Sequence, residues 1–190
     1  YKDAGVARNI YMNADGIVFR TAPSGSADGA ITWTEVGRWR EGGGLCFNGD
    51  TAAANALNDY EEGTWDPQFA NSSKSTDNIS AQPTGRHGSY TKIGDRVFFN
   101  CWINGDLTTT ETTSAIRIIN LPFDAASGGD GYSALSIWNY GGFSTYKDEL
   151  YARNQNGDDQ IVLQRYGADL NFNDIVKSNI NIMISGHYHV

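Results

Sequence analysis

Residues 96–103 constrain the fold of this chain more than any other segment, because their apolar and polar side chains alternate. One face would carry Val97, Phe99, Cys101 and Ile103, and the other Phe98, Asn100 and Trp102. A period of two predicts a β-strand with one buried face. Comparable runs occupy residues 115–121, 132–140, 149–153, 160–166 and 180–190. Strands at intervals of about 8–15 residues predict an antiparallel β-sandwich of jelly-roll type.

Composition agrees with an all-β chain. Its 190 residues include 22 glycines, 4 prolines and 10 tyrosines, which is typical of short strands joined by tight turns. Apolar residues make up 39% of the sequence, enough for one full domain and an extension. The net charge of −8 disfavours binding to nucleic acid or an anionic membrane through a basic patch.

Cysteine content and hydropathy limit where the protein is made. Cys46 and Cys101 are the only cysteines, too few for a disulfide framework. We expect both to be free and buried, with a single bridge as the alternative. No run is long enough for membrane insertion and no signal-peptide pattern opens the sequence, so we expect assembly in the cytoplasm. Because the first residue is Tyr1 and not Met, we expect a preceding N-terminal region.

The first sixty residues have a different pattern. Residues 13–20 and 35–40 alternate over only a few positions, which predicts short strands separated by glycine turns. Such strands cannot bury a core alone, and pairing between subunits would close their edges. Residues 51–59 predict a short helix or turn with Thr51 as its N-cap. We therefore divide the chain into a stem or trimerisation region, residues 1–60, and a β-sandwich head, residues 61–190.

Two segments at the start of the head carry a family resemblance. Residues 57–65 read Leu-Asn-Asp-Tyr-Glu-Glu-Gly-Thr-Trp, and residues 90–97 read Tyr-Thr-Lys-Ile-Gly-Asp-Arg-Val. Together they resemble the stem-to-head junction of bacteriophage tail-fibre and appendage proteins. The resemblance implies a homotrimeric virion protein with an intertwined β stem, joined to other virion proteins through its preceding region. It also implies attachment to a host surface glycan or another outer-membrane component. The alternative is a structural trimer of a head fibre, capsid decoration or baseplate, with no receptor role.

Aromatic residues interleaved with acids and amides suggest where a glycan would bind. Sugar rings stack on flat aromatic faces, and their hydroxyls form hydrogen bonds with carboxylates and amides. The candidate glycan-binding residues are Trp102, Trp138, Tyr140, Tyr146, Asp148 and Tyr151. The alternative is that these aromatic side chains fill the core or a subunit interface. Trp65 is expected to pack the stem against the head.

His187 and His189 form a candidate metal site. A strand would place both imidazoles on one face, and three chains would bring six of them to a threefold axis, an arrangement suited to a transition metal. The alternative is that both histidines are solvated or packed. No other cofactor is expected.

Enzymatic chemistry is not expected. The adjacent acids at residues 61–62, 148–149 and 158–159 would point to opposite faces of a strand, whereas a glycosidase needs two carboxyls about 5–10 Å apart across a sugar. No catalytic triad or phosphate-binding loop is present. Asn-Gly-Asp at residues 48–50, 104–106 and 156–158 predicts three turns, and the polar residues 71–88 predict a long mobile loop or an arm.

Overall fold

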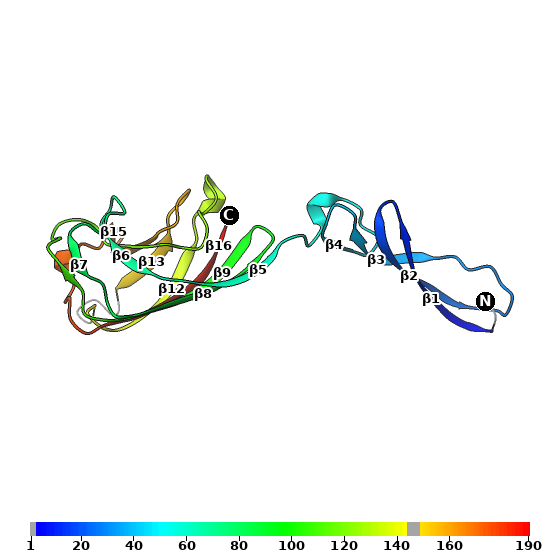
Figure 1. The fold of residues 1–190 in the computed structure, drawn as a ribbon, viewed down its shortest axis with the longest axis horizontal. Coiled ribbons are helices and arrows are strands. Elements are labelled where there is room, and N and C mark those ends of the chain that lie inside the picture. Colours follow the sequence, from blue (N-terminus) through cyan, green and yellow to red (C-terminus); the bar gives the residue numbers. More distant parts are fainter. Residues whose placement is uncertain (1–2, 144–148) are drawn as a thin grey trace. The chain divides into compact units, whose positions relative to one another are not determined.

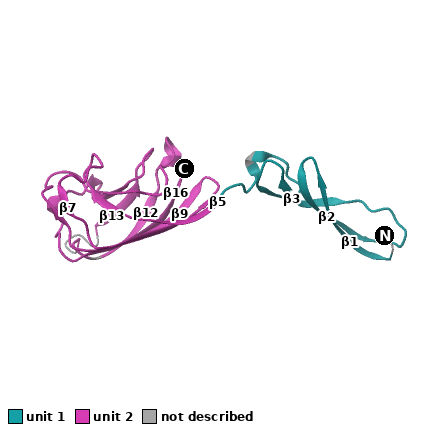
Figure 2. Cartoon of the chain, in the orientation of Figure 1, with its two compact units in different colours: residues 1–60 teal, residues 61–190 magenta. Residues whose placement is uncertain are grey.

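A computed structural model describes residues 3–143 and 149–190. The protein is all-β, as predicted, with 54% of its residues in strands and 4% in helices. It divides into two compact units, Tyr1–Tyr60 and Glu61–Val190 (Figure 2). The elements (Figure 1) are β1 (Gly5–Asn13), β2 (Gly16–Gly25), β3 (Thr34–Arg40), β4 (Leu45–Phe47), η1 (Ala53–Asn55), β5 (Tyr60–Trp65), β6 (Gln68–Ala70), β7 (Ile79–Ala81), β8 (Gly85–Ile93), β9 (Arg96–Gly105), β10 (Thr108–Thr109), β11 (Arg117–Ile119), η2 (Gly129–Gly131), β12 (Ala134–Gly141), β13 (Leu150–Asn154), β14 (Ile161–Arg165), β15 (Ala168–Asp169), η4 (Phe172–Asp174) and β16 (Ile180–His189).

Unit 1 is one antiparallel sheet of four strands in the order β1-β2-β3-β4. Gly16, with a φ of 124°, opens β2 after the tight turn that follows β1. Among the apolar side chains described in this unit, only Val18, Ala22 and Cys46 are buried. Unit 1 is therefore a single layer with a very small core.

Residues 51–59 contain one 3-10 turn, η1, which agrees with the predicted short helix or turn. Thr51 as its N-cap is wrong, because the capping position is Ala52, which forms no side-chain cap. Instead, Asp50 Oδ1 accepts a hydrogen bond from the Ala52 backbone N–H at 2.8 Å, and Asp50 Oδ2 accepts one from Asn55 Nδ2 at 2.5 Å. The Asp50 carboxylate thus provides a hydrogen-bond acceptor at this end of the segment. The hydrogen bonds that it accepts, first that from Ala52, hold the pKa of Asp50 below the usual range.

Unit 2 is built on a curled antiparallel sheet in the order β5-β8-β9-β16-β12-β13-β14-β11-β6, with β15 added beside β14. Its inner face encloses one apolar core to which strands from both ends contribute, including Phe69, Phe99, Ile118 and Ile182. Each run between residues 96 and 190 that was predicted as a strand corresponds to an observed strand of this sheet. In β9 the predicted alternation is confirmed, since Val97 is 0% exposed and its neighbour Phe98 is 45% exposed.

Two predictions about turns and loops are wrong. Residues 71–88 are not one long loop, because β7 pairs with β10 and β8 begins at Gly85. Asn104 and Gly105 do not form a turn either, since both continue β9 and pair with β16. The turn at residues 48–50 is confirmed by positive φ angles of 55° at Asn48 and 76° at Gly49. The turn at residues 156–158 is confirmed between β13 and β14, with a φ of 68° at Gly157.

The two segments that carry the family resemblance are neighbours in the sheet, because β5 lies beside β8. Tyr90 donates a hydrogen bond from Oη to Glu61 Oε1 at 2.5 Å, and its ring lies over Gly63, where a β-carbon would come within 2.6 Å of the ring. Gly94, with a φ of 61°, then turns β8 into β9. Trp65 belongs to the core of unit 2, where its ring packs edge to face on that of Phe99 with the ring centres 6.1 Å apart.

Both cysteines are free and buried, as predicted. Burial raises the pKa of the Cys101 thiol to about 12. The helices among residues 3–143 and 149–190 are all too short or too polar to cross a membrane.

Candidate functional site

The outer face of β8, β9, β16 and β12 carries two parallel rows of side chains. Residues that lie opposite each other in antiparallel strands share a face, so the register defines both rows. The aromatic row consists of His87, Trp102, Met183 and Trp138. The polar row, two residues along each strand, consists of Ser89, Asn100, Ser185 and Ser136.

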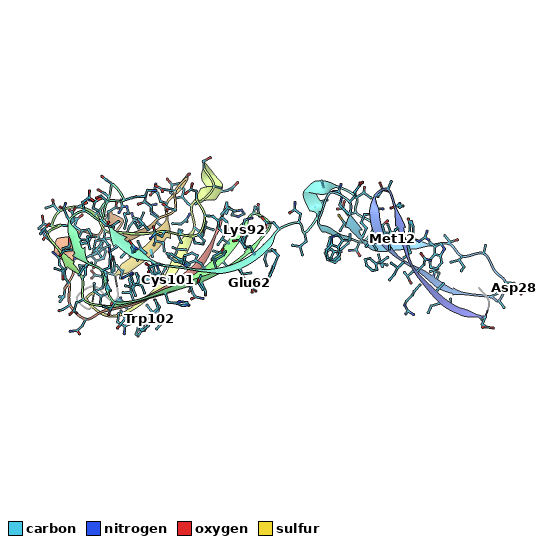
Figure 3. All side chains as sticks on the ribbon, viewed as in Figure 1. Met12, Asp28, Glu62, Lys92, Cys101 and Trp102 are labelled. Atoms are coloured by element: carbon cyan, nitrogen blue, oxygen red, sulfur yellow. The ribbon has the colours of Figure 1, made fainter. Side chains whose placement is uncertain are left out.

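The aromatic row is exposed. Trp102, Met183 and Trp138 are 42%, 48% and 49% exposed, respectively. Figure 3 shows Trp102 on the outer side of unit 2, whereas the preceding residue, Cys101, is 3% exposed and faces the core. The indole N–H of Trp102 donates a hydrogen bond to Asn181 Oδ1 at 2.9 Å, which fixes one edge of the ring. Two strand spacings separate the tryptophans, so their backbones lie about 10 Å apart with Met183 between them.

A groove of about 470 Å³ lies along three of the four residues of the polar row. It is lined by Glu62, Gly63, Ser89, Phe98, Asn100 and Ser185, among others. The aromatic row lies about 7 Å further along the strands. Hydroxyl and amide groups therefore stand next to flat apolar surfaces, which is the chemistry that binds a sugar ring and its hydroxyls together.

The structure brings together only part of the predicted glycan site. Trp102 and Trp138 share the aromatic row, whereas Tyr151 in β13 lines a second, separate groove. Tyr140 falls in β12, but its side chain lies outside the described part of the chain. Tyr146 and Asp148 also lie outside the described residues.

His187 and His189 lie on the outer face of β16, on either side of the buried Tyr188. The His187 ring lies 5.7 Å from the Phe98 ring. His189 has its Nδ1 atom 3.5 Å from Asp95 Oδ2, and its Nε2 atom contacts the Arg96 guanidinium. A guanidinium next to a ring nitrogen disfavours a cation at that nitrogen. A metal shared among three chains at these histidines stays a prediction.

Three of the paired acids that the structure describes form ion pairs. Lys74 Nζ lies 2.6 Å from Asp158 Oδ1 and 2.8 Å from Asp159 Oδ1. Together with Asp124, these two acids form the one cluster of potential metal ligands found in the described chain, and the Lys74 ammonium pairs with two of its three carboxylates. Glu149 forms an ion pair with Arg165 at 3.0 Å.

Sequence reasoning missed six of the eight members of the two rows as binding residues: His87, Met183, Ser89, Asn100, Ser185 and Ser136. The alternation of residues 96–103 places Asn100 on the same face as Trp102, which is the signal that would have found it. The two residues of β16 had no comparable signal, because strand order cannot be read from the sequence. No family model matches the chain, and no curated protein or solved structure gives a significant match.

Proposed function

We propose that this chain is a homotrimeric subunit of a bacteriophage tail fibre or related virion appendage, and that it attaches the particle to a glycan on the host cell surface. In this proposal unit 1 is the stem, and unit 2 is a β-sandwich head that binds without bond chemistry. The observation that carries the proposal is the aromatic row beside the polar row on the outer face of unit 2. Such an open face suits a long surface polysaccharide better than an enclosed small molecule.

Subunit association is supported by one face of the sheet in unit 1. Two adjacent cross-strand rows on that face are apolar: Met12, Ile17, Trp39 and Leu45, then Ile10, Phe19 and Phe47. We call these seven residues the stem face. Met12 (labelled in Figure 3) is 79% exposed and Trp39 is 61% exposed. A single sheet with an uncovered apolar face is not stable alone in water, so neighbouring copies would cover it.

Three copies would also explain how an open site holds a cell. A shallow sugar contact is weak by itself, because it excludes little water. Several linked heads raise the effective concentration of each site after the first contact. A trimer, repeated over several fibres, would then attach firmly through weak single sites.

The exposed apolar side chains of unit 2 favour one alternative. Phe98, Trp102 and Met183 could be covered by a neighbouring head in the trimer, because exposed apolar patches also mark subunit interfaces. The protein would then be a structural virion component of a head fibre, capsid decoration or baseplate, with no receptor role.

The test is binding of the purified protein to an array of bacterial surface polysaccharides, with thermal unfolding measured on the same samples. Trp102→Ala and Trp138→Ala should each weaken binding by about 1–3 kcal/mol and leave the melting temperature nearly unchanged. Tyr166→Ala serves as the control, because Tyr166 is 69% exposed and lies outside both rows. If the parent binds no polysaccharide, or both tryptophan variants bind as the parent does, the proposal is wrong. Loss of trimerisation in the variants would support the structural alternative.

A further inference from the structure

The second groove of unit 2 has a different chemistry from the polar row. Its volume is about 750 Å³, and its lining includes Tyr132, Leu150, Tyr151, Arg153 and Gln164. Tyr132 is 54% exposed and Tyr151 is 56% exposed, so both present ring surface to solvent. The groove therefore combines two flat aromatic surfaces with one guanidinium.

Contacts within the chain hold Arg153 in place. Its Nη1 atom donates hydrogen bonds to the Asn154 carbonyl oxygen at 3.2 Å and to Gln155 Oε1 at 3.0 Å. Its guanidinium carbon lies 5.5 Å from the centre of the Tyr132 ring. Stacking on an aromatic ring and bonds from one nitrogen orient the fork of the guanidinium without neutralising it.

No carboxylate in the described part of the chain forms an ion pair with Arg153. The charges of Arg153 and Asp169, an acid on the adjoining β15 strand, attract each other at longer range, but the ion pair of Asp169 at 2.6 Å is with Arg117, and Asp169 accepts a hydrogen bond from the Gln164 amide at 3.0 Å. Because Arg153 lines the groove and no carboxylate of the described residues lies within ion-pair distance of it, its guanidinium is open to an anion that enters from solvent.

A second arginine of the same hairpin provides the internal comparison. Arg165 also stacks on a tyrosine, with its guanidinium carbon 5.2 Å from the centre of the Tyr166 ring. Unlike Arg153, it forms an ion pair with Glu149 at 3.0 Å. The two arginines therefore share a stacked geometry, but of the two only Arg165 forms an ion pair with a carboxylate of the described residues.

Gln164 adds a group suited to a hydroxyl. It lies directly opposite Tyr151 in the register of β13 and β14. Its Nε2 atom donates to Asp169 Oδ1, and this bond fixes the orientation of the amide and makes its oxygen an acceptor at the groove. One groove thus contains aromatic surface, a cation and an amide oxygen that can accept a hydrogen bond from a ligand hydroxyl.

We propose that this groove binds a sugar residue that carries a carboxylate, such as a hexuronic acid. The Arg153 guanidinium takes the carboxylate, Tyr132 and Tyr151 contact the ring, and Gln164 accepts a hydrogen bond from a hydroxyl. Because the chain has a net charge of −8, this attraction is local and does not come from the field of the whole protein. The inference deepens the proposed attachment function by naming an acidic glycan, but it uses a different groove from the aromatic row.

The experiment is calorimetric titration of the purified chain with oligogalacturonate and with the same oligosaccharide as its methyl ester. The ester removes the charge and keeps the ring. The parent should bind the acid about tenfold or more tightly than the ester, because a charge-assisted hydrogen bond is lost. Arg153→Gln should remove that difference, and Arg165→Gln, the matched control, should preserve it. Arg153→Lys should retain part of the preference, because it keeps the charge and loses the planar fork.

Several results would overturn the inference. These are equal affinity of the parent for acid and ester, no binding of either, or an Arg153→Gln variant that melts normally and keeps the full preference. The outcome is separable from that of the proposed function. Trp102→Ala and Trp138→Ala should leave the galacturonate preference intact. If those two variants lose polysaccharide binding while the parent does not distinguish acid from ester, attachment stands and the acidic site falls. If the parent prefers the acid and both tryptophan variants bind polysaccharide as the parent does, the acidic site stands and attachment through the aromatic row falls.

Discussion

The indole of Trp65 lies so close to Gly88 that a β-carbon at residue 88 would stand 2.2 Å from the indole nitrogen. Gly88 lies opposite Cys101 in β9, and Trp65 also meets Phe99 of that strand. The ring thereby ties β5, the first strand of unit 2, to the core. The Trp65–Gly88 contact also links β5 to β8, the strand in which the second segment of the family resemblance begins.

Gly88→Ala should lower the free energy of unfolding of unit 2 by about 1–3 kcal/mol, because the added methyl group displaces the indole from a packed core. Denaturant unfolding followed by tryptophan fluorescence measures the loss. The control is Gly129→Ala, where a β-carbon would meet nothing within 4 Å and φ is not positive. Equal stability of the two variants would contradict this account of the Trp65 contact.

Trp39→Asp should weaken subunit association, because association removes the stem face from water and would bury the new charge. We expect a loss of about 1–3 kcal/mol, visible as a shift toward smaller species in sedimentation velocity over a concentration series. The control is Asn48→Asp, which adds the same charge at an exposed turn. A parent chain that sediments as a folded monomer at micromolar concentration would show that the stem face is not a subunit interface.

Deleting residues 1–56 should leave unit 2 folded and weaken its association. The apolar core of unit 2 is formed by residues between Trp65 and Tyr188, so it does not depend on unit 1. Circular dichroism should retain a cooperative β-sheet transition, while sedimentation shows smaller species than the parent. If the shortened chain loses its β-sheet signal, the two units form one cooperative domain.

The Lys74 ion pairs should make stability depend on pH in the acid range. Burial alone would raise the pKa of Asp158, but hydrogen bonds led by that of Lys74 outweigh it and lower the pKa below its usual value. A carboxyl whose pKa is lower in the folded state stabilises the fold above its unfolded pKa of about 4, and this contribution is lost as pH falls through the folded pKa.

Lys74→Met should therefore reduce the slope of unfolding free energy against pH below about pH 5, with its main loss of stability at neutral pH. Urea unfolding over a pH series measures both effects. The control is Lys177→Met, because Lys177 Nζ donates to the Glu111 backbone carbonyl oxygen, which does not titrate. This control should lose similar stability at every pH. An unchanged slope in Lys74→Met would show that the carboxylates do not depend on Lys74.

Identical Asn-Gly dipeptides at residues 48–49 and 104–105 adopt different structures, which the local sequence does not predict. Asn48 and Gly49 both have positive φ and form the predicted turn, whereas Asn104 and Gly105 continue β9, and of these two only Gly105 has a positive φ, of 128°. Asn-Gly only permits a turn. Pairing partners on both sides, from β8 and β16, hold Asn104 in the extended conformation. The outcome thus depends on strands that are distant in the sequence.

The sequence by itself determined the strand-rich class and the face on which each side chain of β9 lies, because alternation is a local property of an extended backbone. The aromatic row shows what only the tertiary structure decided. Met183 stands between Trp102 and Trp138 because β16 inserts between β9 and β12. The order of strands depends on which non-local pairings best bury one shared core, and no local pattern encodes that choice.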